Sequence, residues 1–196
     1  EDKSGWSAFL RHLVDRGLNG VQLIISDACR GLIESAAEYL PEARWQRCMI
    51  HFYRNVFSHV PAAKVRDVAH MLKAIHAQES REAAEQKTRM IIEELKARKM
   101  SKAAELVEQA VNETLTYYAF PDIHWQKIRT NNPLERIMRE IRRRTRVVGA
   151  FPDGQSCLNL AAARLRYIAV SAWSTKRYMN MRPLHQSQVM QTGAVA

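Results

Sequence analysis

Cysteine is scarce in this sequence, and its three occurrences lie far apart, at Cys29, Cys48 and Cys157. An odd number of widely spaced cysteines does not suit a disulfide framework, so we expect none and predict a chain that folds in a reducing compartment. The 196 residues are enough for one full domain, or for a core with a substantial insertion, but not for two large domains.

Long apolar segments are also missing. No run approaches the roughly twenty apolar residues that span a bilayer, and the residues from Glu1 to Trp6 lack the basic-then-apolar order of a signal peptide. We therefore expect a soluble, intracellular protein without a membrane partner. There is no Gly-rich phosphate loop and no Gly-x-Ser-x-Gly motif, which argues against an NTPase and against a hydrolase with a nucleophile elbow.

Acidic residues are in the minority. Twenty Asp and Glu stand against thirty Lys and Arg, which gives a formal net charge of +10. Such a surplus favours a polyanionic partner. Nucleic acid is the leading candidate, and an anionic membrane surface is the weaker one.

The first fifty residues alternate between helix and strand patterns. Apolar positions at helical spacing predict a helix over 4–17, and a second helix follows Asp27 and stops at Pro41. The short apolar run 21–25 predicts a strand buried on both faces, and 45–50 predicts a second strand at the spacing of a β-α-β unit. Two strands are few, because sheets usually have about four to six. The pattern is that of part of a larger α/β domain.

The stretch 51–120 is helical almost throughout, with breaks near Pro61, Ser80 and Ser101. One apolar stripe in it predicts packed helices rather than disorder. Its members are Val65, Val68, Ala69, Leu72 and Ile75.

Two more helices are expected in the C-terminal third. Asn132 is a natural N-cap, Pro133 suits the first helical position, and Glu135 falls three residues after that cap. The last helix is expected over 156–174, and the tail 179–196 should be loosely ordered. The apolar residues expected to face a core are Leu134, Ile137, Met138 and Ile141 in the first helix and Leu158, Leu160, Ala161, Leu165 and Ile168 in the second.

Arginine lines the helix that begins near Pro133. Only Glu140 interrupts the set, which consists of Arg136, Arg139, Arg142, Arg143, Arg144 and Arg146. The cluster is denser than solubility requires, and we expect it to hold nucleic-acid phosphates without reading sequence. The alternative is a solvated charged face.

Two carboxylates, those of Asp27 and Glu135, are candidate ligands of a metal ion. Asp27 follows the first predicted strand, where ligand-binding groups gather in α/β sheets, and Glu135 opens the arginine helix. If the fold brings them together, they could bind Mg²⁺ with phosphate oxygens and water. Each also has a structural alternative. Asp27 could cap the next helix, and Glu135 could close a capping box or pair with Arg139.

Cys48 and His51 form a Cys-x-x-His pair that invites a zinc interpretation. The pair has no second pair nearby and completes no tetrahedral ligand set. A buried Cys48 at the end of a strand, with His51 supporting the site, is the preferred interpretation.

The motifs together resemble a known family. The segments ISDACRGL (25–32), WQRCMIHFYRN (45–55), TNNPLER (130–136) and EIRRRTRVVGAFP (140–152) are similar to the catalytic region of Mutator-type bacterial insertion-sequence transposases. The resemblance extends over about residues 6–178. It implies an RNase H-like fold with an Asp-Asp-Glu metal triad and an α-helical insertion between the second Asp and the Glu.

The resemblance also assigns residues. It implies that Asp27 is the second aspartate and Glu135 the glutamate, both catalytic ligands of Mg²⁺ or Mn²⁺, with Cys48 and His51 as the family's Cys-x-x-His signature beside them. The residues assigned to DNA contact are Asn131, Asn132, Arg136, Arg139, Arg142, Arg143, Arg144 and Arg146. The implied partners are the transposon ends and target DNA, with a homo-oligomer in the intact enzyme and a bacterial, nucleoid-associated cytoplasmic location.

We therefore expect a predominantly helical α/β protein. It should hold a partial RNase H-like core over 1–52 and 121–178, a helical insertion over 53–120, and the tail. The family's first aspartate lies in an Asp-Ala-x-Tyr-like context on an early strand, and these residues contain no such segment. The expected function is metal-dependent DNA strand cleavage and strand transfer in the intact enzyme. The alternative is an inactive truncated fragment that acts at most as a DNA-binding or regulatory module, so whether this chain alone is an enzyme stays open.

Overall fold

The computed structural model describes residues 2–171, 175 and 178–184. The chain divides into two compact units, 1–130 and 131–196, which are described separately. Every described hydrophobic residue that is buried lies in the first unit, between Leu10 and Ile128. Helices predominate, as predicted, and none of those described is long and apolar enough to cross a membrane.

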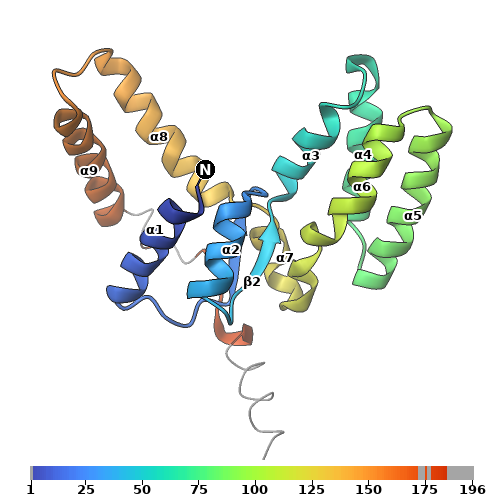
Figure 1. Ribbon diagram of the computed structural model, residues 1–196, viewed down its shortest axis with the longest axis horizontal. Coiled ribbons are helices and arrows are strands. Elements are labelled where there is room, and N and C mark those ends of the chain that lie inside the picture. Colours follow the sequence, from blue (N-terminus) through green and yellow to red (C-terminus); the bar gives the residue numbers. More distant parts are fainter. Residues whose placement is uncertain (1, 172–174, 176–177, 185–196) are drawn as a thin grey trace, which may run out of the picture. The chain divides into compact units, whose positions relative to one another are not determined.

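The first unit opens with a small α/β piece (Figure 1). Its elements are α1 (Lys3–Asp15), β1 (Leu23–Ser26), α2 (Arg30–Tyr39) and β2 (Arg44–Arg47). The two strands pair in parallel, with Leu23 opposite Arg44 and Ser26 opposite Arg47. A parallel pair needs a crossover between its strands, and α2 supplies it. The predicted β-α-β order is therefore confirmed.

The strands themselves differ from the prediction. β1 is only partly buried, because Leu23, Ile24 and Ile25 keep some exposure and only Ser26 is buried. The expectation of a strand buried on both faces is therefore wrong for this structure. In the described residues the sheet has just two strands, so each strand has a single neighbour. One side of β1 does contribute to a core, since Ile24 packs against the α1/α2 cluster around Leu10.

β2 is shorter than predicted, because the chain turns into a helix after Arg47. The N–H of Cys48 donates to the Ser26 carbonyl (2.7 Å), and α3 (Met49–Phe57) begins at the next residue. The apolar residues after Cys48 therefore pack from a helix and do not extend the strand.

Helices fill the rest of the first unit. After α3 come η1 (Ala62–Lys64), α4 (Val65–Ile75), α5 (Arg81–Ala97), α6 (Ser101–Ala110), η2 (Val111–Thr114), η3 (Thr116–Ala119) and α7 (Asp122–Ile128). The predicted breaks are confirmed: the chain leaves the helical conformation around Pro61, and Ser80 caps α5 by accepting a bond from the Ala83 N–H (3.1 Å). The stripe on α4 is also confirmed, with Val68, Leu72 and Ile75 fully buried. Burying each such side chain stabilises the fold by about 1.5–3 kcal/mol.

A buried polar group, His76, joins three elements of this helical part. Its Nδ1 lies 2.9 Å from the Tyr53 hydroxyl of α3, and its Nε2 lies 2.8 Å from Thr114 Oγ1 of η2. The Thr114 hydroxyl donates its own hydrogen to the Val111 carbonyl (2.6 Å), so it accepts from Nε2. Burial disfavours the charged ring and lowers the pKa of His76 to about 4. His76 is therefore a neutral link between α3, α4 and η2.

The described part of the second unit is mainly a hairpin of two helices, α8 (Asn132–Val148) and α9 (Gly154–Val170). The C-cap of α8 is Gly149, whose φ of 79° favours glycine. The N-cap of α8 is Asn131 and not Asn132 as predicted, so the helix starts one residue early. Asp153 caps α9 by accepting from the Ser156 N–H (2.6 Å). The predicted end of this helix at 172–174, and the tail from 185 onward, lie outside the described residues.

The predicted core faces of α8 and α9 are only partly correct. Leu134, Met138, Leu158 and Leu165 are exposed and were wrongly assigned to a core. A hairpin of two helices has one shared seam, so each helix can turn only a narrow stripe inward. The apolar positions that do become half-buried are Ile137, Ile141, Leu160, Ala161 and Ile168.

Candidate functional site

Asp27 lies immediately after β1 and is exposed. Its Oδ1 accepts a hydrogen bond from the N–H of Ala28 (2.8 Å). The N-cap of α2 is Cys29, and the cap has no side-chain hydrogen bond, so the alternative that Asp27 caps this helix is wrong. A carboxylate offers about four lone-pair sites, and the Ala28 bond occupies one. Asp27 thus presents a hard oxygen ligand at the carboxyl end of a parallel strand.

The backbone around Asp27 is held by several bonds. The Asp27 carbonyl accepts from the Ser26 hydroxyl (2.7 Å) and from the Cys29 N–H (2.8 Å). The Ser26 hydroxyl oxygen in turn accepts from Trp45 Nε1 on β2 (2.8 Å). These bonds fix the main chain from which the carboxylate projects, which is what a metal ligand requires.

Cys48 and His51 stand next to this strand end. The Cys48 N–H donates to the carbonyl of Ser26, the last residue of β1. Because Asp27 directly follows Ser26, this bond holds the start of α3 beside the strand end. Cys48 is fully buried, as predicted, and His51 is half-buried. Within the described part of either unit, no three His, Cys, Asp or Glu side chains form a group that could hold a metal ion, so the zinc interpretation gains no support.

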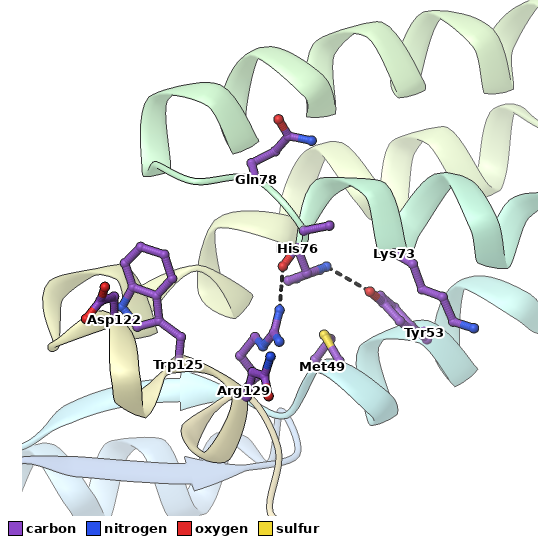
Figure 2. A pocket seen from close by; sticks show the side chains of 10 residues that line it. Met49, Tyr53, Lys73, His76, Gln78, Asp122, Trp125 and Arg129 are labelled. Carbon is purple, nitrogen blue, oxygen red and sulfur yellow. Dashed lines mark hydrogen bonds between the residues drawn. The ribbon is translucent and has the colours of Figure 1, made fainter. Parts of the chain in front are cut away.

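A pocket of about 510 Å³ lies in the first unit between α3, α4 and α7 (Figure 2). A backbone bond from the Met49 N–H to the Arg129 carbonyl (3.0 Å) joins two of its walls. Met49 directly follows Cys48, so one wall of the pocket begins where β1 and α3 meet. Sequence reasoning missed this pocket, because its walls come from elements far apart in the chain.

Glu135 belongs to the second unit, in the first turn of α8, and is half-buried. With Asn131 as the N-cap, Leu134 takes the third helical position and Glu135 the fourth. The predicted capping box is therefore out of register, and the Asn131 side chain makes no capping hydrogen bond to the first turn. Asp27 and Glu135 lie in different units, so their convergence stays a prediction.

The arginines predicted to contact DNA are all exposed. They are Arg136, Arg139, Arg142, Arg143, Arg144 and Arg146. Two of them also serve the hairpin itself: Arg143 (3.0 Å) and Arg144 (3.4 Å) pair with Glu140. Arg164 of α9 joins the same carboxylate at 2.6 Å. The bond from Arg143, helped by the charges of Arg143 and Arg164, holds the pKa of Glu140 down at about 2.

Sequence reasoning treated Glu140 only as an interruption of the arginine stripe. The spacings Glu140 to Arg143 and Glu140 to Arg144 were a usable signal for local ion pairs. Arg164 gave no such signal, because its place on the inner side of α9 depends on how the hairpin packs. Its guanidinium lies over the Tyr167 ring, 4.6 Å from the centroid.

Similar proteins are transposases of bacterial insertion sequences. The chain is 39% identical over 184 residues to the transposase for insertion sequence element IS406 of Burkholderia multivorans, covering 93% of this chain and 47% of that protein. It is 37% identical over 192 residues to the IS1081 transposase of Mycobacterium tuberculosis, covering 98% and 46%. For the ISRM5 transposase of Rhizobium meliloti the identity is 35% over 186 residues, covering 95% and 46%. The chain thus spans about half the length of these relatives.

The family can be stated more narrowly. The family described as "Transposase, Mutator family" matches residues 1–173. The chain belongs to this Mutator family of transposases, which confirms the resemblance seen in its motifs.

Proposed function

We propose that these residues form part of the catalytic region of a transposase that, when intact, cuts and joins DNA strands with divalent metal ions. The observation that carries the proposal is the exposed carboxylate of Asp27 at the carboxyl end of a parallel strand, in a chain whose arginine helix opens with Glu135. The parallel β1/β2 pair with its α2 crossover is compatible with an RNase H-like core, and 53–120 would be its helical insertion.

The residues present suit Mg²⁺ or Mn²⁺. Mg²⁺ is commonly bound through one or two carboxylates, with the remaining positions taken by water and substrate phosphates. Asp27 and Glu135 would supply those carboxylates, and a bound ion would activate water or a 3′-hydroxyl and neutralise phosphate charge. The exposed arginines of α8 would hold the DNA backbone of the transposon ends and target. We extend the proposal to a homo-oligomer in the intact enzyme.

A non-catalytic DNA-binding role is the second candidate. The finding that favours it is that the described part of neither unit gathers three potential metal ligands. Two carboxylates alone would bind an ion weakly and position a reacting phosphate poorly. The two candidates differ in whether Asp27 and Glu135 share an ion.

A double-mutant cycle on Mn²⁺ affinity tests this first prediction. If both carboxylates hold one ion, they lie within roughly 10 Å of each other. Asp27→Asn and Glu135→Gln should then each weaken Mn²⁺ binding, and the double variant should lose less than the sum of the two effects. Electron paramagnetic resonance of free Mn²⁺ measures the affinity.

Matched controls exist elsewhere in the chain. Asp15→Asn changes an exposed aspartate at the end of α1, and Glu82→Gln changes a glutamate in the first turn of α5, as Glu135 is in α8. Neither control should affect the affinity. Losses at Asp27 and Glu135 no larger than those of the controls would remove the metal assignment and leave the DNA-binding role.

A further inference from the structure

The pocket of the first unit has the chemistry of a nucleotide site. Its walls combine two cations, Lys73 and Arg129, with the indole of Trp125 and the apolar side chain of Met49. Figure 2 shows Arg129 between Trp125 and Met49, with His76 above it in this view and Tyr53 to the right. The volume of about 510 Å³ is in the range of small-molecule sites.

Arg129 is held in place before any ligand arrives. Its Nη1 donates to the His76 carbonyl, and its guanidinium carbon lies 5.5 Å from the centroid of the Tyr117 ring. Its own carbonyl accepts from the Met49 N–H. A guanidinium carries five N–H donors in a fixed fork, so a group anchored in this way still has donors for an anion. Arg129 is thus a preorganised, half-buried anion contact.

The charge of the lining suits a single phosphodiester. Lys73 and Arg129 are positive, and Asp122 is the one acidic residue among those that line the pocket. Burial lowers the pKa of His76 to about 4 and raises the pKa of Tyr53, so both are neutral at pH 7. The lining therefore carries a formal charge of +1, which one phosphodiester would neutralise.

Trp125 presents a fixed aromatic surface. Its Nε1 donates to the Phe120 carbonyl (2.7 Å), and its ring makes edge contacts with Tyr117 (centroids 5.8 Å apart) and Tyr118 (4.7 Å). A base stacks on such a ring whatever its identity, because every base has a π face. Only an unpaired base is available for this, since a paired base is already stacked inside its duplex.

The position of the pocket connects it with the candidate metal ligand. The backbone bond between Met49 and Arg129 and the one between Cys48 and Ser26 tie the pocket wall to the strand end that carries Asp27. The start of α3 is thus common to the pocket and to the surroundings of Asp27.

We propose that this pocket binds one unpaired nucleotide of a DNA strand, with its phosphate on Arg129 and Lys73 and its base against Trp125. The inference rests on the proposed function, because it takes DNA as the substrate. To the proposed function it adds a subsite that binds one unpaired nucleotide and does not distinguish among the four bases.

The test measures binding of labelled single-stranded oligonucleotides to the whole chain by fluorescence anisotropy in EDTA. The unaltered chain is compared on an intact strand, on a strand of the same length with abasic positions, and with free deoxynucleotide as competitor. We expect the intact strand to bind about fivefold or more tightly than the abasic one, the lower end of the stacking contribution of one base. Free deoxynucleotide should compete only weakly, and competition as strong as that of the strand would show a free-nucleotide site and overturn the proposal.

Charge variants locate the site. Lys73→Gln should weaken binding about fivefold at about 50 mM salt, the expected loss for one phosphate contact. Lys102→Gln, an equal charge change at an exposed lysine of α6 outside the pocket, should have little effect. Asp122→Asn should strengthen binding, because it removes the pocket's acid.

Two further results would overturn the proposal: equal binding of intact and abasic strands by the unaltered chain, or equal losses for Lys73→Gln and Lys102→Gln. The strand comparison needs no variant, so it does not depend on whether a substituted chain folds. Because EDTA removes divalent ions, failure here is separate from failure of the metal assignment.

Discussion

His76 is buried in the first unit, and its imidazole ring is neutral there at pH 7. It is 3% exposed, and burial lowers its pKa from 6.5 to about 4. In the unfolded chain the ring takes up a proton near pH 6.5, while in the folded chain it does so only near pH 4. The unfolded state therefore binds more protons between these two values, so stability falls as the pH falls through this window.

We predict that the free energy of unfolding decreases by about 3 kcal/mol between pH 7 and pH 4 on account of His76 alone. Urea denaturation of the whole chain at several pH values measures it. His76→Gln should lower stability at pH 7, because it disturbs the bonds to Tyr53 and Thr114, but should flatten the pH dependence. His70→Gln, at an exposed histidine of α4, should leave that dependence intact. An equally steep acid loss in His76→Gln would show that other groups cause it.

Glu140 links α8 to α9 through its ion pair with Arg164. It is the subject of a second prediction at the residue scale. Its pKa of about 2 lies below the ordinary 4.5, so its contribution to stability is complete above pH 4.5 and is lost only as the pH falls towards 2. Glu140→Gln should speed amide hydrogen exchange in both helices at pH 7, because the half-buried Arg164 loses its carboxylate partner. Glu105→Gln, at an exposed glutamate of α6, is the control. Unchanged exchange in α9 would contradict this role.

At the scale of elements, the features that the sequence predicts correctly are those that depend on local chemistry. Pro61 and Ser80 mark real breaks, and Asp27 follows a strand as its position after an apolar run predicted. The segment after Arg47 could not be assigned in this way, because short apolar runs fit strand and helix alike. The Cys48 N–H donates to the Ser26 carbonyl, and α3 begins at the next residue. This bond depends on tertiary structure, so the local sequence does not reveal it.

The sequence pattern does not predict the direction of side chains or the presence of the pocket. The sequence carries no local signal for the role of Arg164, which the packing of the hairpin directs inward to Glu140. The pocket joins Met49, Lys73 and Arg129, residues up to 80 positions apart (129 − 49), and only packing brings them to one cavity. Candidate ligands such as Asp27 can be found from sequence because a strand end has a local signature, whereas a cavity between helices has none.

The arginine helix gives the prediction at the element scale. Arg142 and Arg143 are adjacent and exposed, but Arg143 donates two bonds to Glu140 (3.0 Å each). Binding a phosphate therefore costs Arg143 part of an existing ion pair. We expect Arg142→Ala to weaken binding to unrelated duplexes about equally and to make the logarithmic salt slope shallower by about 0.9, and Arg143→Ala to do so by less. Anisotropy titrations across salt concentrations measure both. An effect limited to one DNA sequence would point to base reading instead.

At the scale of the whole molecule, the two units differ in how they are stabilised. All the described buried hydrophobic residues lie before position 130. Neither α8 nor α9 contains a buried residue, and large apolar side chains such as Val147 (81% exposed) and Val170 (84%) face outward. The first unit therefore has a core of its own, and the second has a narrow seam with an ion cluster.

We predict that a polypeptide of residues 1–130 unfolds cooperatively on heating, at a temperature close to that of the whole chain. A polypeptide of residues 131–196 should show little helix in water, because helices of 17 residues are marginal by themselves and this pair lacks a buried core. Far-ultraviolet circular dichroism of both fragments and of the whole chain measures this. Glu140→Gln should further reduce whatever helix the second fragment retains, since removing the carboxylate frees three arginines to repel one another. A sharp thermal transition in fragment 131–196, or a fragment 1–130 without one, would show that the core of the first unit is not what holds this chain together.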